Sequence, residues 1–224
     1  MKAYLISIKS LAENIKSLTF KSEEPLRYTA GQFIEVTLSH DNPDDRGVCR
    51  WFTLSSAPGQ DIFTITTKFA TDRSSSFKQA FHDLSPGDGI QISEPMGDFV
   101  LPKDATIPLV FVAAGIGVTP YHSMIEWLTL NKQTRQIELV YIAKPGESVF
   151  RKSFDIPFVN AHYLENKQKL TAQKIVDIVG SSSHKMIYLA GPEPMIEDIV
   201  TQFKILKVSS SQIVTDYFPG YLDA

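Results

Sequence analysis

The pattern of apolar residues changes near residue 101, and this change constrains the fold more than any other feature of the chain. Before it, short alternating or β-rich runs are separated by turn signals such as Pro86-Gly87-Asp88-Gly89. After Leu101-Pro102-Lys103-Asp104, strand-like and helix-like segments alternate. The sequence therefore predicts two domains: an antiparallel Greek-key β-barrel over residues 1–103, and an α/β domain with a parallel sheet over residues 104–224.

The predicted elements follow from these two patterns. In the first domain the predicted strands are Ala3–Ile8, Ile15–Phe20, Phe33–Leu38, Arg50–Leu54, Phe63–Thr67 and Gly89–Ser93, with one helix at about Ser75–Asp83. In the second domain the predicted strands are Leu109–Ala113, Ile137–Ile142, Asn160–Leu164, Met186–Ala190 and Ile213–Val214. Helices are predicted at Thr119–Leu130, Val149–Phe154, Thr171–Val179 and Pro194–Leu206.

Composition excludes several classes of protein. The single cysteine, Cys49, excludes a disulfide framework, a thiolate zinc cluster and a plant-type iron–sulfur centre carried by this chain alone. A net charge of -3 provides no overall basic field for nucleic acid or an anionic membrane. Lysines interrupt the N-terminal residues too soon for a signal peptide, and the longest apolar stretch, Ile107–Val118, is too short to span a bilayer. These features predict a cytoplasmic protein without a metal site.

The first chemical motif follows the apolar run that begins the second domain. Gly115, Gly117 and Pro120 form a G-x-G-x-x-P pattern between that strand and the next predicted helix. Glycines let the backbone approach a phosphate, and a helix N-terminus supplies free N–H groups. Proline stands where the dinucleotide fingerprint has a third glycine, a position that the first turn of a helix accepts. The alternative is a glycine-rich turn that binds no ligand.

A second glycine turn follows strand Met186–Ala190. It reads Gly191-Pro192-Glu193-Pro194 and leads into a helix. In a parallel sheet both turns lie at the carboxyl edge, where ligands bind. The alternative is that Pro192 and Pro194 only shape the start of the helix.

The informative strand of the first domain is Arg50–Leu54. Arg50 and Phe52 share one face, so they suit a diphosphate clamp and a stacking ring, while Thr53 offers a hydroxyl. The alternative, which spacing alone favours, is an edge-strand arginine and a core phenylalanine. In the segment 72–78, Ser75 and Ser76 cap the predicted helix or bind diphosphate through the same first-turn N–H groups.

Together these segments resemble the ferredoxin–NADP reductase superfamily over nearly the whole chain. The resemblance implies that Arg50 binds the FAD diphosphate, that Phe52 packs against the isoalloxazine and that Thr53 hydrogen-bonds near flavin N5. Ser75 and Ser76 match the second flavin motif, and Met96–Phe99 resembles the segment that closes the barrel. The remaining residues of the expected flavin site are Trp51, Thr66, Lys68 and Phe77.

The same resemblance assigns the nicotinamide-nucleotide site. Gly115, Gly117, Thr119 and Pro120 match its phosphate turn, and Gly191-Pro192 matches the segment that flanks the nicotinamide. The closing segment 216–221 resembles the ending of bacterial members, with Phe218 as the aromatic near the flavin face. Thr53 and Phe218 are thus the residues expected at the reacting atoms.

Three residues depart from the family pattern. Phe52 replaces the usual tyrosine, Ala190 replaces a cysteine that precedes the Gly-Pro pair in many members, and Asp216 stands where glutamate is commoner. Since hydride transfer depends mainly on positioning, none of these removes the mechanism, and no essential general base is expected.

The nucleotide preference depends on the strand Ile137–Ile142. It ends in Ala143-Lys144-Pro145-Gly146, without the carboxylate that holds the ribose 2′-OH of NAD. Lys144 and Arg151 suit a 2′-phosphate, so NADPH is expected, with NADH as the alternative. The other interpretation is that both cations only face solvent.

The sequence thus predicts an FAD-dependent oxidoreductase that takes hydride from NAD(P)H at flavin N5 and passes electrons to a separate acceptor such as ferredoxin or flavodoxin. Three alternatives stay open: a reductase of ferric chelates or a haem protein, a partner-dependent flavin-bound subunit of a larger complex, and a nucleotide-binding module without flavin. Whether Tyr121 and His122 contact the nucleotide also stays open.

Overall fold

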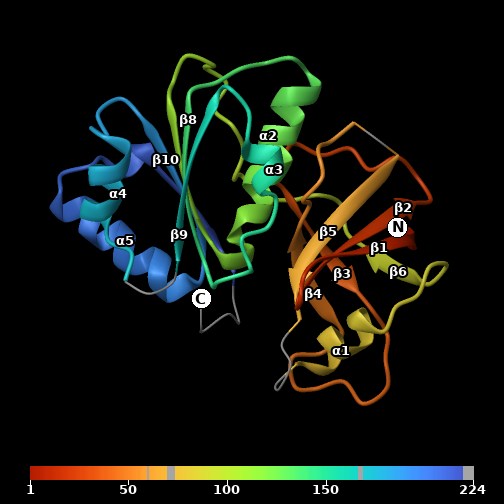
Figure 1. Cartoon of the computed structure of the whole chain (residues 1–224). Helices are drawn as coiled ribbons and strands as arrows, with labels where there is room; N and C mark the ends of the chain where they lie inside the picture. Colours follow the sequence, from red (N-terminus) through yellow and green to blue (C-terminus); the bar gives the residue numbers. More distant parts are fainter. Residues whose placement is uncertain (60, 70–73, 166–168, 219–224) are drawn as a thin grey trace. The chain divides into compact units, whose positions relative to one another are not determined.

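The structure, a computed structural model, describes residues 1–59, 61–69, 74–165 and 169–218. The chain divides into two compact units, Met1–Val100 and Leu101–Ala224, a few residues before the boundary expected from the sequence (Figure 1). Residues 72–73 of the second flavin motif and residues 219–221 of the closing segment lie outside the described residues.

The first unit is a six-stranded antiparallel sheet with strand order β4-β3-β6-β1-β2-β5. Its elements are β1 (Lys2–Ala12), β2 (Ile15–Ser22), β3 (Phe33–Thr37), β4 (Cys49–Thr53), β5 (Ile62–Lys68), α1 (Ser76–His82) and β6 (Gly89–Ile92). A bridge between Leu54 and Ile65 joins the two outermost strands, and the N–H of Ser55 donates to the Thr64 carbonyl at 2.8 Å. These bonds close the sheet into the barrel that the sequence predicts.

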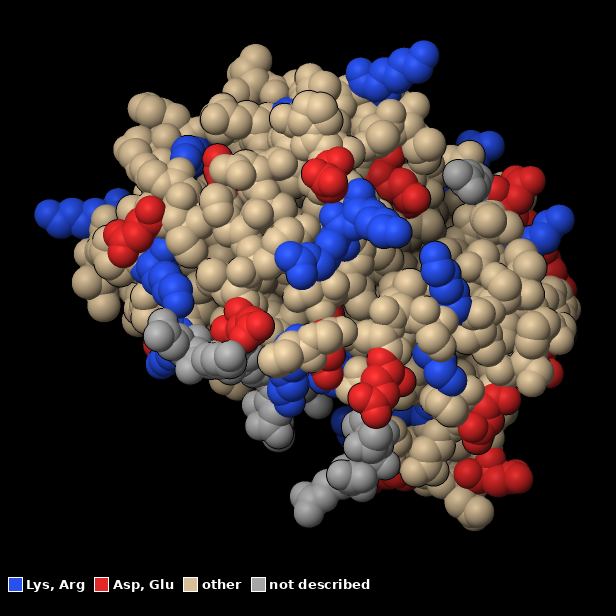
Figure 2. Space-filling model, in the orientation of Figure 1, with Lys and Arg blue, Asp and Glu red and all other residues tan. Residues whose placement is uncertain are grey.

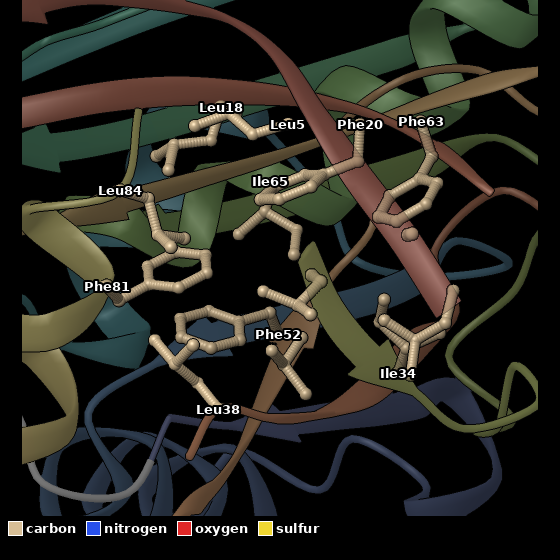
Figure 3. Packing of buried hydrophobic residues seen from close by; sticks show 14 of the residues in the cluster. Leu5, Leu18, Phe20, Ile34, Leu38, Phe52, Phe63, Ile65, Phe81 and Leu84 are labelled. Carbon is tan, nitrogen blue, oxygen red and sulfur yellow. The ribbon is translucent and has the colours of Figure 1, made fainter. Parts of the chain in front are cut away.

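Apolar side chains on the inner faces of these strands form the core of the first unit (Figure 3). Phe20 of β2 and Phe63 of β5 stack with ring centroids 5.5 Å apart. Helix α1 adds Phe77 and Phe81, both fully buried. The ring of Phe81 stacks on Phe52 of β4 at 5.1 Å, which ties the helix to the strand that carries the first flavin motif.

The second unit is a five-stranded parallel sheet with strand order β11-β10-β7-β8-β9. Its strands are β7 (Leu109–Ala114), β8 (Ile137–Ala143), β9 (Val159–Glu165), β10 (Met186–Gly191) and β11 (Ile213–Tyr217). Its helices are the 3-10 helix η1 (Gly115–Val118), α2 (Thr119–Leu130), α3 (Arg151–Phe154), α4 (Ala172–Val179), α5 (Glu193–Ile205) and the 3-10 helix η2 (Ser210–Gln212). The strand order reverses between β7 and β10, so their carboxyl ends form the switch point where such sheets bind ligands.

Helices cover both faces of this sheet, with α4 and α5 on one side and α2 and α3 on the other (Figure 1). Every residue of β7 is buried, as the continuous apolar run predicts for a central strand. β11 is longer than predicted because it pairs with β10 as far as Gly191 and Tyr217. Among the helices of the described residues, none has the length and apolar character needed to cross a membrane.

Candidate functional site

Arg50, the expected diphosphate ligand, lies on β4 with its guanidinium turned back onto the preceding loop. Its Nη1 donates to the carbonyls of Arg46, Gly47 and Cys49 at 2.7, 3.2 and 2.6 Å. Its guanidinium carbon lies 5.2 Å from the centre of the Phe77 ring, a cation–π distance. Arg50 is therefore held by its own chain in a fixed orientation, with 18% of its side chain exposed.

Ser75 and Ser76, the second flavin motif, begin helix α1. The hydroxyl of Ser75 accepts the N–H of Lys78 at 3.2 Å, so Ser75 is an N-cap. The N–H of Ser76 donates to Asp44 Oδ2 at 3.0 Å, and its hydroxyl accepts the N–H of Asp44 at 2.9 Å. Asp44 thus contacts the same residues that the resemblance assigns to a diphosphate.

Burial alone would raise the pKa of the Asp44 carboxyl, but its partners outweigh this effect. N–H bonds from Ser76 and Arg46 and the charge of Arg50, 3.4 Å away, together lower that pKa below its ordinary value. Asp44 is consequently a carboxylate at neutral pH. No pattern in the sequence singles out Asp44, because it lies in a loop, 32 positions before its partner Ser76.

Phe52 and Phe77, two aromatic members of the expected flavin site, belong to the barrel core. Phe52 is 8% exposed and packs against both Phe77 and Phe81, as Figure 3 shows for Phe52 and Phe81. Lys78, which the sequence did not single out, places its ammonium 5.1 Å from the centre of the Phe52 ring and bonds the Thr67 hydroxyl. The ring of Phe52 therefore has a cation–π contact with Lys78 in addition to its aromatic neighbours.

Thr53 and Trp51 project from the opposite face of β4. Thr53 is buried and pairs with Phe33 of β3. Trp51 is 63% exposed, its ring lies 5.9 Å from that of Phe33, and its Nε1 donates to Glu35 Oε2 at 3.1 Å. The strand therefore carries the two expected cofactor contacts Phe52 and Thr53 on different faces.

The remaining expected residues, Thr66 and Lys68, lie on β5. The hydroxyl of Thr66 is bonded to those of Ser17 and Ser55 at 2.6 and 2.8 Å inside the barrel. The carbonyl of Lys68 accepts a bond from the Lys78 ammonium at 3.2 Å. The Thr66 hydroxyl is thus part of a hydrogen-bond network inside the barrel.

In the second unit the two glycine turns meet at the switch point of the sheet. An added Cβ at Gly117 would lie 2.3 Å from the carbonyl oxygen of Ala190, so only glycine lets η1 approach the end of β10 this closely. Gly115 has a φ of +54° and no atom within 4 Å of an added Cβ. Its surroundings leave the backbone open to a ligand that approaches the turn, which fits a phosphate cradle.

Gly191 ends β10, and Pro192 stands at the N-cap of α5. An added Cβ at Gly191 would lie 2.8 Å from the Ala114 side chain at the end of β7. The N–H of Phe218 donates to the Gly191 carbonyl at 3.0 Å. The fold therefore brings the Gly191-Pro192 segment and Phe218 to the end of β10 that Gly117 approaches.

Thr119 and Pro120 occupy the first turn of α2. Thr119 is buried and its hydroxyl donates to the Ile116 carbonyl at 3.0 Å, which stabilises the turn. Pro120 is also buried. Because N–H groups in the first turn of a helix have no acceptor within the helix, proline is accepted at this position without loss of a hydrogen bond.

Tyr121 packs α2 against the sheet. It is fully buried, stacks on Phe111 at 4.5 Å, and its hydroxyl donates to the carbonyls of Val112 and Tyr188 at 3.0 and 2.8 Å. Burial, with the nearby Asp216 charge, raises its pKa well above the ordinary value. His122 stacks on Phe150 at 3.8 Å.

Asp216 lies on β11 in register with Ala190, beside the end of β10. Burial raises the pKa of its carboxyl to about 7. The group therefore changes charge near neutral pH at the edge of the sheet where the glycine turns meet.

Lys144 follows β8 and is exposed. The guanidinium carbon of Arg151 lies 4.0 Å from the centre of the Tyr163 ring. Glu165, at the end of β9, is in register with Ala143 and places a carboxylate near the same edge. Glu165 was not among the predicted site residues, because the prediction of the nucleotide preference considered only the end of the second strand of this unit, and Glu165 ends the third strand.

Lysine and arginine side chains are interspersed with aspartate and glutamate on the face drawn in Figure 2. Within the described ranges, no group of three or more histidine, cysteine, aspartate or glutamate side chains is arranged to hold a metal ion.

Known proteins share this arrangement of a barrel and a parallel sheet. The flavohem-like FAD/NAD-binding domain of a nitric oxide dioxygenase from Vibrio cholerae O1 biovar El Tor superposes with a TM-score of 0.81 at 18% identity, over 97% of this chain and 98% of that chain. A ferredoxin–NADP⁺ reductase from Plasmodium falciparum superposes with a TM-score of 0.81 at 14% identity, over 97% of this chain and 95% of that chain. The chain has the fold of the ferredoxin–NADP reductase superfamily. This confirms the resemblance and the two-domain fold expected from the sequence.

The sequence comparison finds similarity to flavohemoproteins. A flavohemoprotein from Bacillus subtilis (strain 168) is 33% identical over 151 residues, which are 65% of this chain and 37% of that protein. The ferredoxin–NADP reductase-like chain therefore spans little more than a third of that relative's length. No family model matches the chain.

Proposed function

We propose that this chain is an NAD(P)H-dependent flavin oxidoreductase that binds FAD in its barrel unit and the nicotinamide nucleotide in its α/β unit. The observation that carries the proposal is the contact of Gly117 with the Ala190 carbonyl, which joins two glycine turns at the switch point of a parallel sheet. When bound, the flavin would supply the redox chemistry: its N5 takes hydride, and the reduced ring passes electrons to an acceptor.

In the barrel unit, Arg50 and Ser76 bind the diphosphate of FAD. Arg50 supports this role because its guanidinium is already held by three carbonyls and its Nη2 points toward an anion, the carboxylate of Asp44. Phe52 and Thr53 lie on the same strand as Arg50, so one rigid element positions the groups assigned to the two ends of the cofactor. Lys78 places a positive charge beside Phe52.

In the α/β unit, Gly115 and Gly117 let the nucleotide diphosphate approach the backbone of the phosphate turn. Phe218 is anchored to Gly191 by its N–H, so its position depends on the end of β10. We assign Phe218 to the nicotinamide and expect Phe218→Ala to change nucleotide binding while flavin stays bound. Equal kinetics of wild type and variant with both nucleotides would contradict this assignment.

Lys144 supports NADPH as the donor, since its exposed ammonium follows the second strand of the sheet. Glu165 favours NADH, because a carboxylate at this edge binds a ribose 2′-OH and repels a 2′-phosphate. We propose NADPH and test it with the pair Lys144→Ala and Glu165→Gln. We expect Lys144→Ala to raise the KM for NADPH but not for NADH, and Glu165→Gln to lower the KM for NADPH. If instead Lys144→Ala leaves the KM for NADPH unchanged and Glu165→Gln raises the KM for NADH, the chain uses NADH.

A haem protein is the acceptor that the comparisons favour, because the Bacillus subtilis relative is a flavohemoprotein and the Vibrio cholerae neighbour is the flavohem-like domain of a nitric oxide dioxygenase. Ferredoxin, flavodoxin and ferric chelates are the other candidates, and a partner-dependent subunit is the second function. The cytoplasm remains the proposed location.

The experiment is steady-state oxidation of NADPH or NADH by the FAD-loaded chain with each acceptor class in turn. The proposal predicts turnover with at least one acceptor and a strong preference for a haem protein over ferredoxin. A chain that binds FAD but oxidises neither nucleotide with any acceptor supports the partner-dependent subunit. A chain that binds no flavin contradicts the proposal.

A further inference from the structure

The carboxylate of Asp44 contacts both groups that we assign to the FAD diphosphate. Its Oδ2 accepts the N–H of Ser76 at 3.0 Å, and its Oδ1 lies 3.4 Å from Nη2 of Arg50. Carboxylate and phosphate oxygens bind the same N–H and guanidinium donors. Asp44 thus bonds to donors that a diphosphate would otherwise use.

The loop around Asp44 is fastened in this position by further bonds. The hydroxyl of Ser76 accepts the N–H of Asp44 and meets Nε2 of His40, both at 2.9 Å. The N–H groups of Arg46 and Gly47 bond to the carboxylate and the carbonyl of Asp44 at 3.1 and 2.9 Å. This turn therefore presents the carboxylate toward β4 and α1.

We propose that Asp44 is a specificity-determining residue that competes with the diphosphate of FAD for Arg50 and Ser76. The inference rests on the proposed function, which gives these two residues to the diphosphate. Two anions repel each other at one set of donors, so FAD binds only when Asp44 withdraws. Part of the binding free energy of FAD is then spent on opening the loop.

Riboflavin escapes this competition because it carries the isoalloxazine and the ribityl chain but no phosphate. Asp44 consequently reduces the difference in affinity between FAD and riboflavin at this site. The competition is measured as the ratio of the dissociation constants for FAD and riboflavin. A merely structural role of Asp44 would not change this ratio.

The test titrates the flavin-free full chain with FAD and with riboflavin, following flavin fluorescence. The variants are Asp44→Asn and the matched control Asp45→Asn, which removes the same charge from an exposed neighbour in the loop. We expect Asp44→Asn to bind FAD at least about threefold more tightly than wild type, the scale of one exposed ion pair. Riboflavin affinity stays unchanged in both variants, and Asp45→Asn binds FAD like wild type.

An unchanged or weakened FAD affinity in Asp44→Asn, with riboflavin binding intact, overturns the inference alone and makes Asp44 a residue that orients Arg50. Absence of binding of both flavins to wild type overturns the proposed function and the inference together. If Asp44→Asn does not fold, as shown by far-ultraviolet circular dichroism, Asp44→Ser is titrated in the same way, because serine keeps a hydrogen-bond acceptor in the turn.

Discussion

A single methyl group at Gly117 should destabilise the α/β unit. An added Cβ would lie 2.3 Å from the Ala190 oxygen, 2.6 Å from its carbonyl carbon and 2.8 Å from the nitrogen of Gly191. Unstrained non-bonded contacts of carbon need about 3.5 Å, so the end of β10 or the turn must move by roughly 1 Å. All three of these nearest atoms belong to the backbone of a central strand, so none of them is the end of a flexible side chain that could give way.

The size of the effect follows from two opposing contributions. Overpacking of this kind costs about 3 kcal/mol, the upper end of the usual range, because the neighbours are backbone. Replacing glycine by alanine reduces the entropy of the unfolded chain, which returns up to about 1 kcal/mol. We therefore expect Gly117→Ala to lower the free energy of unfolding by about 2 kcal/mol.

The assay is urea unfolding of the flavin-free chain followed by far-ultraviolet circular dichroism. Gly115→Ala is the matched control, since its added methyl group meets no atom within 4 Å and its cost is the strain of a φ of +54°. That strain is worth about 1 kcal/mol. A Gly117→Ala variant at least as stable as Gly115→Ala would refute the close approach of the turn to β10.

The other predictions concern the flavin unit, the packing of α2 and the titration of the Asp216 carboxyl on β11. Arg50→Ala removes three bonds to loop carbonyls and the diphosphate ligand; FAD titration should show at least a roughly tenfold weaker affinity, and unchanged flavin occupancy would remove Arg50 from the site. Tyr121→Phe deletes the hydroxyl between the Val112 and Tyr188 carbonyls, and thermal unfolding should detect a loss of about 1 kcal/mol; full stability would mean that these bonds contribute nothing. Burial raises the pKa of Asp216 to about 7, so between about pH 4 and pH 7 the folded state holds a proton that the unfolded state has released. The contribution of Asp216 to stability is therefore lost as pH rises through this window; unfolding at pH 5 and pH 8 should show a smaller difference in Asp216→Asn than in wild type, and equal differences would contradict the burial of a charged group there.

Periodicity and turn signals were enough to predict the strands and α-helices and their order, but not the two 3-10 helices η1 and η2. The continuous apolar run at Leu109–Ala113 is the central strand β7, and the alternation in Phe63–Thr67 is the strand β5. Both patterns depend on burial of neighbouring residues in one strand, which the sequence records directly. β11 extends to Tyr217 because pairing with β10, a long-range interaction, decides where it ends.

The sequence predicted the glycine turns but not the polar contacts of the barrel unit. Gly117 is recognisable because a backbone approach requires glycine at that position. Asp44 and Lys78 are not, since each acts through residues that only the folded barrel brings near. The Thr66 hydroxyl bonds Ser17, which is 49 positions away, so its inward direction follows from strand pairing.

If this chain is an NAD(P)H-dependent flavin oxidoreductase, hydride passes from the nicotinamide nucleotide to a flavin that the chain binds. The most direct test mixes the anaerobic, FAD-loaded chain with NADPH, then with NADH, and follows absorbance in the flavin band in a single turnover. We expect rapid bleaching of the flavin band, faster with NADPH than with NADH, and slower bleaching in Phe218→Ala. A flavin that stays oxidised with both nucleotides would contradict this function.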